Sequence, residues 1–156
     1  MLSKGNVLEL FVSVGKSREN KNDIALDKGG VVEDKYYNKN IDRSVLITSI
    51  SSYEIAKEHG IIAPFSTLGE NLLIDYNLYH LLPGEQLQIG EVVLEISQNC
   101  TLCKSLAKVD SRLPEILKND RGIFAKVIKG GVIAKGNNIY LLKKGKGELD
   151  ENKISA

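Results

Sequence analysis

Two cysteines, Cys100 and Cys103, are the residues of this sequence best suited to carry chemistry, and the chain contains no others. A thiolate is both a strong nucleophile and a soft ligand for soft metal centres. Lys104 directly follows Cys103, and a neighbouring ammonium group favours the thiolate form of a cysteine. The motif Cys100-Thr-Leu-Cys103 therefore predicts a catalytic or metal-ligating thiolate just after a strand.

Three other interpretations of the cysteine pair stay open. A structural zinc site needs about four ligands, and only His59 and His80 could join the two thiolates. A redox dithiol of the thioredoxin type needs a βαβ context, whereas the segments around this pair are rich in strands. The third interpretation is a pair of buried, inert thiols. The histidines themselves favour structural roles, His59 at the end of a predicted helix and His80 in an apolar run.

Several polar residues could hold an anionic ligand, with a solvated or structural role as the alternative for each. Lys35, Arg43 and Lys104 carry cations that can bind a phosphate. Asn71 follows Gly69 and Glu70 between a loop and a strand, where an amide can orient a polar ligand or stabilise a turn. The sequence has neither a glycine-rich P-loop nor a Gly-x-Ser-x-Gly elbow.

The elements that must position these residues are indicated by short apolar runs between glycines. A helix is predicted over 51–59, with Ser51 and Glu54 as a capping box and Gly60 just past its end. A second short helix is predicted over 114–118, and the polar stretch 15–28 is expected to be a loop. Strands are predicted at 7–14, 43–50, 71–75, 86–89, 92–96, 123–128, 132–134 and 139–142.

These elements predict a mainly β fold, a β-rich α+β domain with one or two short helices. Strands and helices do not alternate as they do in a doubly wound parallel sheet. A closed or nearly closed barrel of about seven strands removes the free edges of so many short strands. We expect a single domain over residues 1–156, with its core at about 5–143 and a frayed tail at 144–156.

The composition is that of an ordinary soluble domain. The 156 residues are 42% apolar and 26% charged, which excludes a mainly disordered chain and a disulfide-dense miniprotein. A net charge of +1 gives no bulk field for nucleic acid or anionic membrane, so neither is expected as a partner. No apolar run is long enough to span a bilayer and the N-terminus lacks a signal-peptide pattern, so we expect a cytoplasmic protein.

Four ordered blocks of the sequence resemble the MOSC domain family, which is named for the C-terminal region of molybdenum cofactor sulfurase. The order and spacing of the blocks hold from about residue 5 to residue 143. Lys35 stands where the family usually has arginine, and lysine is a point charge rather than a planar fork. The blocks are 30–36, 43–47, 68–72 with 82–90, and 95–103 with 121–133.

The resemblance implies a barrel-like fold and binding of the molybdenum cofactor (molybdopterin), a molybdenum-carrying pterin with a phosphate. It implies that Cys103 carries sulfur as a persulfide or ligates molybdenum. Arg43, Asn71 and Asp34 match positions expected near the cofactor, with Lys35 and Lys104 as further candidates. Partners would be a sulfur donor such as a cysteine desulfurase, because the sequence shows no pyridoxal-phosphate desulfurase domain, or a molybdoenzyme or electron-donor reductase.

Two alternative functions remain open at this stage. Some MOSC proteins are associated with molybdenum-dependent reduction of N-hydroxylated bases, which needs electrons from a separate donor. Two cysteines cannot supply the four thiolates of a typical iron–sulfur cluster, so that donor would be another protein. The second alternative is a binding or adaptor module whose cysteines are inert.

Overall fold

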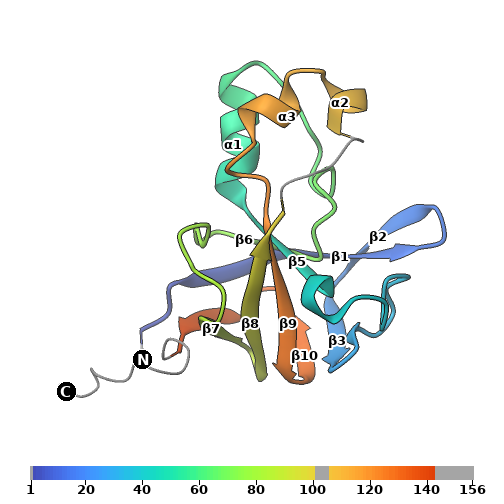
Figure 1. Ribbon diagram of the computed structural model, residues 1–156, viewed down its shortest axis with the longest axis vertical. Helices are drawn as coiled ribbons and strands as arrows, with labels where there is room; N and C mark the ends of the chain where they lie inside the picture. Colours follow the sequence, from blue (N-terminus) through green and yellow to red (C-terminus); the bar gives the residue numbers. More distant parts are fainter. Residues whose placement is uncertain (1, 101–105, 143–156) are drawn as a thin grey trace.

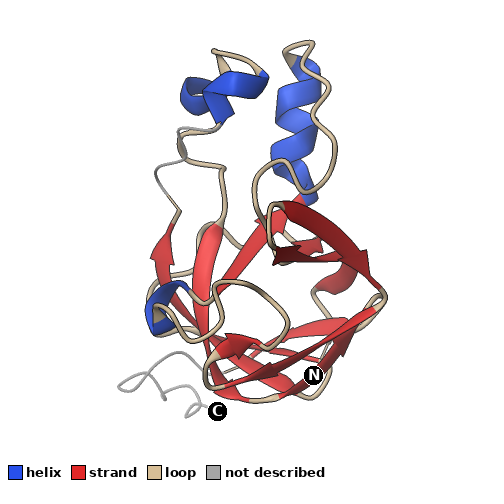
Figure 2. Ribbon diagram, turned by 90° about the vertical axis from the view of Figure 1, so that its right-hand side faces the viewer, coloured by secondary structure: helices blue, strands red, loops and turns tan. Residues whose placement is uncertain are grey.

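Seven strands close into a mixed barrel in the computed structural model, which describes residues 2–100 and 106–142 (Figures 1 and 2). Around the barrel the order is β11-β7-β8-β9-β5-β6-β1, and β1 pairs again with β11. All of these pairs are antiparallel except the parallel pair β5–β6. The expected mainly β fold with a closed barrel is confirmed. The bounds are β1 Gly5–Val14, β5 Val45–Ser49, β6 Leu72–Ile74, β7 Gln86–Ile89, β8 Val92–Asn99, β9 Ile123–Lys129 and β11 Asn138–Leu141.

The barrel interior is filled by aliphatic side chains that alternate along each strand. In β5, Val45 and Ile47 belong to the interior cluster, so Leu46 and Thr48 between them face outward. Burying so many aliphatic groups is the main source of the barrel's stability. The residues of this cluster that belong to the seven barrel strands are Val7, Leu10, Val12, Val45, Ile47, Leu72, Ile74, Leu87, Ile89, Val92, Leu94, Ile96, Ile123, Ala125, Val127 and Ile139.

The polar stretch 15–28 is not the loop that we expected, because it contains two strands. β2 (Ser17–Lys21) forms a hairpin with the second half of β1, and β3 (Asp23–Asp27) joins β4 (Gly30–Val31) and β10 (Gly131–Ala134) in a small second sheet. β2 buries no side chain fully, so it carries no apolar alternation, and its pairing with β1 defines it as a strand. Figure 1 shows this β1–β2 hairpin projecting from the barrel.

Three short α-helices cover one end of the barrel, where one or two were expected (Figures 1 and 2). They are α1 (Ile50–Glu58), α2 (Leu106–Val109), which the sequence did not indicate, and α3 (Leu113–Ile116). A 3₁₀ turn, η1 (Ile41–Arg43), precedes β5, so Arg43 does not begin that strand as we expected. The helices pack on a second apolar cluster, separate from the barrel interior. It is made of Tyr53, Ala56, Ile61, Leu68, Leu73, Leu106, Leu113 and Leu117.

The predicted capping box of α1 is wrong, because the helix follows β5 without a loop. Ser49, the last residue of β5, is the N-cap, and its hydroxyl accepts a hydrogen bond from the Ser51 N–H. This places the helix start two residues earlier than the capping box requires. The predicted end is confirmed, since His59 is the C-cap and Gly60 follows with φ +77°.

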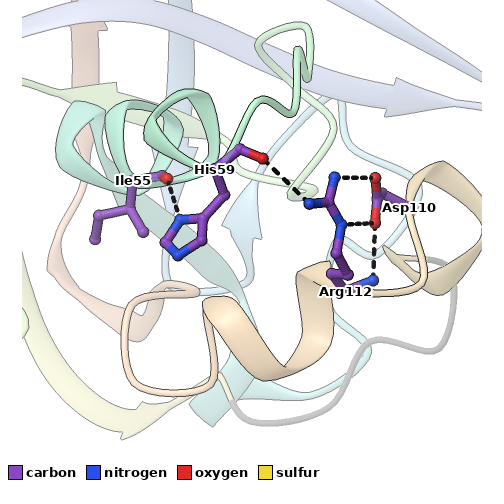
Figure 3. A network of polar contacts seen from close by, with 4 residues as sticks. All are labelled: Ile55, His59, Asp110 and Arg112. Carbon is purple, nitrogen blue, oxygen red and sulfur yellow. Dashed lines mark hydrogen bonds and ion pairs between the residues drawn. The ribbon is translucent and has the colours of Figure 1, made fainter.

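A polar network ties the end of α1 to the segment between α2 and α3 (Figure 3). The Arg112 guanidinium donates to both carboxylate oxygens of Asp110, at 3.0 and 2.9 Å, and to the main-chain oxygen of His59 at 3.2 Å. His59 Nδ1 lies 2.9 Å from the carbonyl oxygen of Ile55. His59 therefore closes the helix end, a structural role rather than a ligand role.

Replacing Asp110 with Asn is expected to remove a pH-dependent part of the stability. Hydrogen bonds from Arg112 lower the pKa of Asp110 from 3.8 to about 2. Because the folded-state pKa is the lower one, the carboxylate stabilises the fold above pH 3.8, and this contribution is lost as the pH falls towards 2. Urea unfolding should therefore separate wild type from D110N at neutral pH and bring them together near pH 2.

The matched control is Glu115→Gln, which removes the partner of Lys118 in an exposed ion pair of 3.4 Å. Exposed pairs contribute little, so E115Q should change the unfolding free energy only slightly at either pH. A D110N deficit that persists undiminished at low pH would contradict the assigned role of the Asp110 carboxylate.

Candidate functional site

A pocket of about 350 Å³ lies outside the barrel wall, against the outward faces of β5 and β9. Leu46 and Phe124 contribute apolar surface, and polar residues from β1, β2 and two loops surround them. Ligand sites of proteins commonly have this size and this mixture of apolar surface and convergent polar groups. The lining residues are Ser13, Arg18, Asp34, Tyr36, Lys39, Asn40, Arg43, Ser44, Leu46, Gly69, Asn71 and Phe124.

Asn71 has a structural role at this pocket, because its side chain links three segments of the pocket wall. Its Oδ1 accepts a hydrogen bond from the Leu46 N–H at 3.0 Å, and its Nδ2 donates to the Phe11 carbonyl at 3.2 Å and to Asp34 Oδ1 at 3.3 Å. The side chain is 6% exposed. The amide is thus already engaged by β5, β1 and the loop that carries Asp34, so it shapes the pocket wall.

Asp34 is engaged in a similar way. Its Oδ1 accepts from the Ser13 N–H at 2.7 Å, and its Oδ2 accepts from the Tyr36 N–H at 3.0 Å. The carboxylate is 7% exposed, and its lone pairs are committed to these groups and to Asn71. Asp34 therefore holds the loop after β4 against the end of β1.

Three cations, Arg18, Lys39 and Arg43, line the pocket against a single acid, Asp34. The guanidinium carbon of Arg43 lies 4.8 Å from the centroid of the Phe124 ring, a stacked cation–π contact. Partial burial lowers the pKa of Arg18 from 12.5, yet an arginine stays protonated at neutral pH. The pocket is therefore cationic and suits an anionic ligand with a planar part.

The predicted site residues divide into three groups. Asp34, Arg43 and Asn71 lie together in the pocket. Lys35 does not line it, because its ammonium donates to the carbonyl oxygen of Gly15 at 3.1 Å. Cys103 and Lys104 lie outside the described residues.

Cys100 and His80 fall in different places. Cys100 is 7% exposed and packs with Leu46 and Phe124, so it lies beside the pocket floor. His80 is exposed, and its Nε2 lies 3.3 Å from the hydroxyl of Tyr76, away from the pocket. Within residues 2–100 and 106–142, no group of three or more His, Cys, Asp or Glu side chains could hold a metal ion.

Sequence reasoning missed Arg18 and Lys39. Arg18 lies in the polar stretch that was expected to be a loop, and only the pairing of β2 with β1 brings it to the pocket. Lys39 belongs to the loop between β4 and η1, where no pattern separates it from other exposed lysines. A hairpin prediction for residues 10–21 would have been the one signal pointing to Arg18.

Arg121 is a buried cation that needs an explanation. It is 4% exposed, and its Nε and Nη1 have no hydrogen-bond partner among the residues that the structure describes. A buried unpaired guanidinium is costly, so such groups are compensated by an acceptor, a water or an anion. The next residue, Gly122, packs against Leu46 of the pocket floor, which places the Arg121 backbone beside the site.

The fold is that of a closed β-barrel domain with a cationic pocket on its outer wall. The family model of the MOSC domain matches residues 28–140, and the chain belongs to the MOSC domain family, which is associated with the molybdenum cofactor. No curated protein sequence matches this chain. Among the described residues, none of the helices is long and apolar enough to cross a membrane.

Solved structures share this fold. The YuaD protein from Bacillus subtilis superposes with a TM-score of 0.75 at 18% identity, covering 86% of this chain and 93% of that one. YiiM from Escherichia coli gives 0.65 at 20% identity, with 89% and 70% covered. YiiM from Geobacillus stearothermophilus gives 0.64 at 17% identity, with 92% and 76% covered. At these identities the likeness shows the fold.

Replacing Asn71 with Ala should destabilise the fold by about 2–4 kcal/mol, because it leaves the buried Leu46 N–H and Phe11 carbonyl without partners. Urea unfolding measures this loss. Asn77→Ala is the matched control, since Asn77 is exposed and bonds only Ser51 and Tyr79 nearby. Equal losses of stability in the two variants would contradict the structural role assigned to the Asn71 hydrogen bonds.

Replacing Arg121 with Met should raise the free energy of unfolding by about 1 kcal/mol or more in a buffer without oxyanions. Methionine fills a similar volume and removes a buried guanidinium whose Nε and Nη1 lack acceptors among the described residues. Arg121→Lys keeps the charge, so it should show no such gain. Urea unfolding of the three proteins distinguishes these outcomes, and a loss of stability in R121M would show that the guanidinium is already compensated.

Proposed function

We propose that this protein binds the molybdenum cofactor in the pocket lined by Arg18, Arg43 and Asn71. The observation that carries the proposal is the charge of the pocket, where three cations face one carboxylate that is committed to main-chain groups. A ligand with a phosphate and a planar ring system satisfies both the cations and the apolar floor. Membership of the MOSC domain family supports molybdopterin as that ligand.

The residues present fit the parts of such a ligand. Arg18 and Lys39 can pair with a phosphate, and arginine does so with two parallel hydrogen bonds. Arg43, whose guanidinium carbon lies over the Phe124 ring, supplies a cation and a planar group beside which the pterin could bind. Asn71 and Asp34 keep the wall in place. The bound group would supply molybdenum redox or sulfur chemistry, while these residues bind and orient it.

Cys103 completes the proposal as a sulfur carrier or a molybdenum ligand. It lies outside the described residues and follows Cys100, which packs on the pocket floor, by three positions in the sequence. A persulfide role would require a sulfur donor such as a cysteine desulfurase. A ligand role would make a molybdoenzyme or an electron-donor reductase the partner, and reduction of N-hydroxylated bases the reaction to assay.

The test is anaerobic equilibrium binding of molybdenum cofactor to wild type, Arg18→Met and Cys103→Ala. Losing an arginine–phosphate pair should weaken binding by about tenfold or more. C103A should weaken binding if the thiolate ligates molybdenum, and should abolish sulfur transfer without weakening binding if it carries a persulfide. These two results separate the two roles of Cys103.

Lys118→Met is the matched control, because it removes an exposed cation at the end of α3, outside the pocket. It should bind the cofactor as tightly as wild type. Weak or absent binding by wild type, or equal losses in R18M and K118M, would overturn the proposed function.

A further inference from the structure

Glu70 is a buried carboxylate next to the pocket, but it does not line the pocket. The residue is 0% exposed. The Tyr53 hydroxyl donates to its carboxylate, at 2.9 Å from Oε1 and 2.7 Å from Oε2, and the Ser66 N–H donates to Oε2 at 2.9 Å. Burial raises the pKa of Glu70, while these donors favour its ionised form. A carboxylate buried at such a cost indicates a specific task.

The loop that carries Glu70 and the end of β1 together hold the Arg18 guanidinium through its three nitrogens. Nε donates to Ser66 Oγ at 2.8 Å, Nη1 donates to Ser13 Oγ at 2.8 Å, and Nη2 donates to the main-chain oxygen of Glu70. A guanidinium carries five N–H groups. One N–H on each terminal nitrogen is not used by these bonds, so Arg18 can offer a two-pronged contact to an oxyanion in the pocket that it lines.

Ser66 links the Glu70 carboxylate to the Arg18 guanidinium, and it is held in an unfavourable backbone conformation. Its φ is +85°, and only one other non-glycine residue of the described chain, Asn38, has a positive φ. Such strain persists where surrounding contacts enforce it, and it concentrates at functional sites. Here the N–H of Ser66 bonds the Glu70 carboxylate while its hydroxyl accepts from Arg18, so both contacts enforce the strained turn.

We infer that Glu70 is a positioning residue, which acts through Ser66 and through its own carbonyl to hold Arg18 in the geometry that binds the anionic group of the ligand. Only the identification of that anion as a cofactor phosphate rests on the proposed function. Glu70 itself contacts no ligand. Its buried negative charge also offsets the charge of the half-buried Arg18.

The first measurement is the NMR signal of the Arg18 Nε–H in the unliganded protein. The hydrogen bond to Ser66 Oγ should protect this proton from exchange in wild type. Glu70→Met removes both carboxylate oxygens, including the one that accepts from the Ser66 N–H, so it should release Ser66 and lose the protected signal. Ser66→Ala should lose it too, because it removes the acceptor.

Tyr53→Phe is the matched control. It removes the hydroxyl that bonds Glu70 but leaves the links among Glu70, Ser66 and Arg18 in place. Y53F should lower the melting temperature, as E70M does, yet keep the Arg18 signal. A signal that disappears in Y53F as well, or survives in E70M, would overturn the inference.

The second measurement is titration with inorganic phosphate. E70M should weaken phosphate binding by about tenfold when Arg18 is present and by less than about twofold in an Arg18→Met background, because Glu70 acts through Arg18. Equal losses in both backgrounds, or no phosphate binding by wild type, would overturn the inference. Arg18-dependent phosphate binding without molybdenum cofactor binding would uphold it and overturn the proposed function.

Discussion

The pocket depends on one side chain, that of Asn71, directly before the first residue of strand β6. Leu72 pairs with Leu10 of β1 on one side and with Ile47 of β5 on the other. One residue earlier, the Asn71 amide bonds Leu46 and Phe11, the neighbours of those partners, through its Oδ1 and Nδ2. A side chain thus continues both hydrogen-bond ladders past the end of the strand. The strands of the barrel wall can therefore diverge at this point without leaving buried main-chain groups unsatisfied.

That opening explains why polar residues from distant parts of the chain meet in one place. The end of β1, the hairpin strand β2, the loop after β4 and the loop before β6 all reach the point where β6 begins. Asp34 and Asn71 use their polar atoms on one another and on main-chain groups, whereas Arg18 and Arg43 keep charge available. Structural and ligand-facing roles are therefore divided among neighbouring side chains. Cys100 lies next to this region, because it packs on Leu46 and Phe124 of the pocket floor.

The sequence predicts the barrel well because its strands bury alternate aliphatic residues. Val92, Leu94 and Ile96 show that alternation directly, and the glycine turn at Gly90 is confirmed with φ +59°. β2 was missed because its fixed position comes from hydrogen bonds to β1, and main-chain bonding leaves no mark on residue type. Arg18 was missed with it. The capping-box pattern at Ser51 misplaces the helix start, and the N-cap is Ser49, because the pattern cannot show a helix that follows a strand without a loop.

Because Arg18 lies on β2, the ligand preference of the pocket and the stability of the fold depend on different residues. This residue reaches the pocket from a hairpin strand that contributes no side chain to the barrel interior. Substitutions on β2 can therefore alter which anions are accepted while the aliphatic packing stays intact. Evolution or a protein engineer can vary specificity at this edge with little risk to the scaffold, a form of modularity that sites built inside a barrel lack.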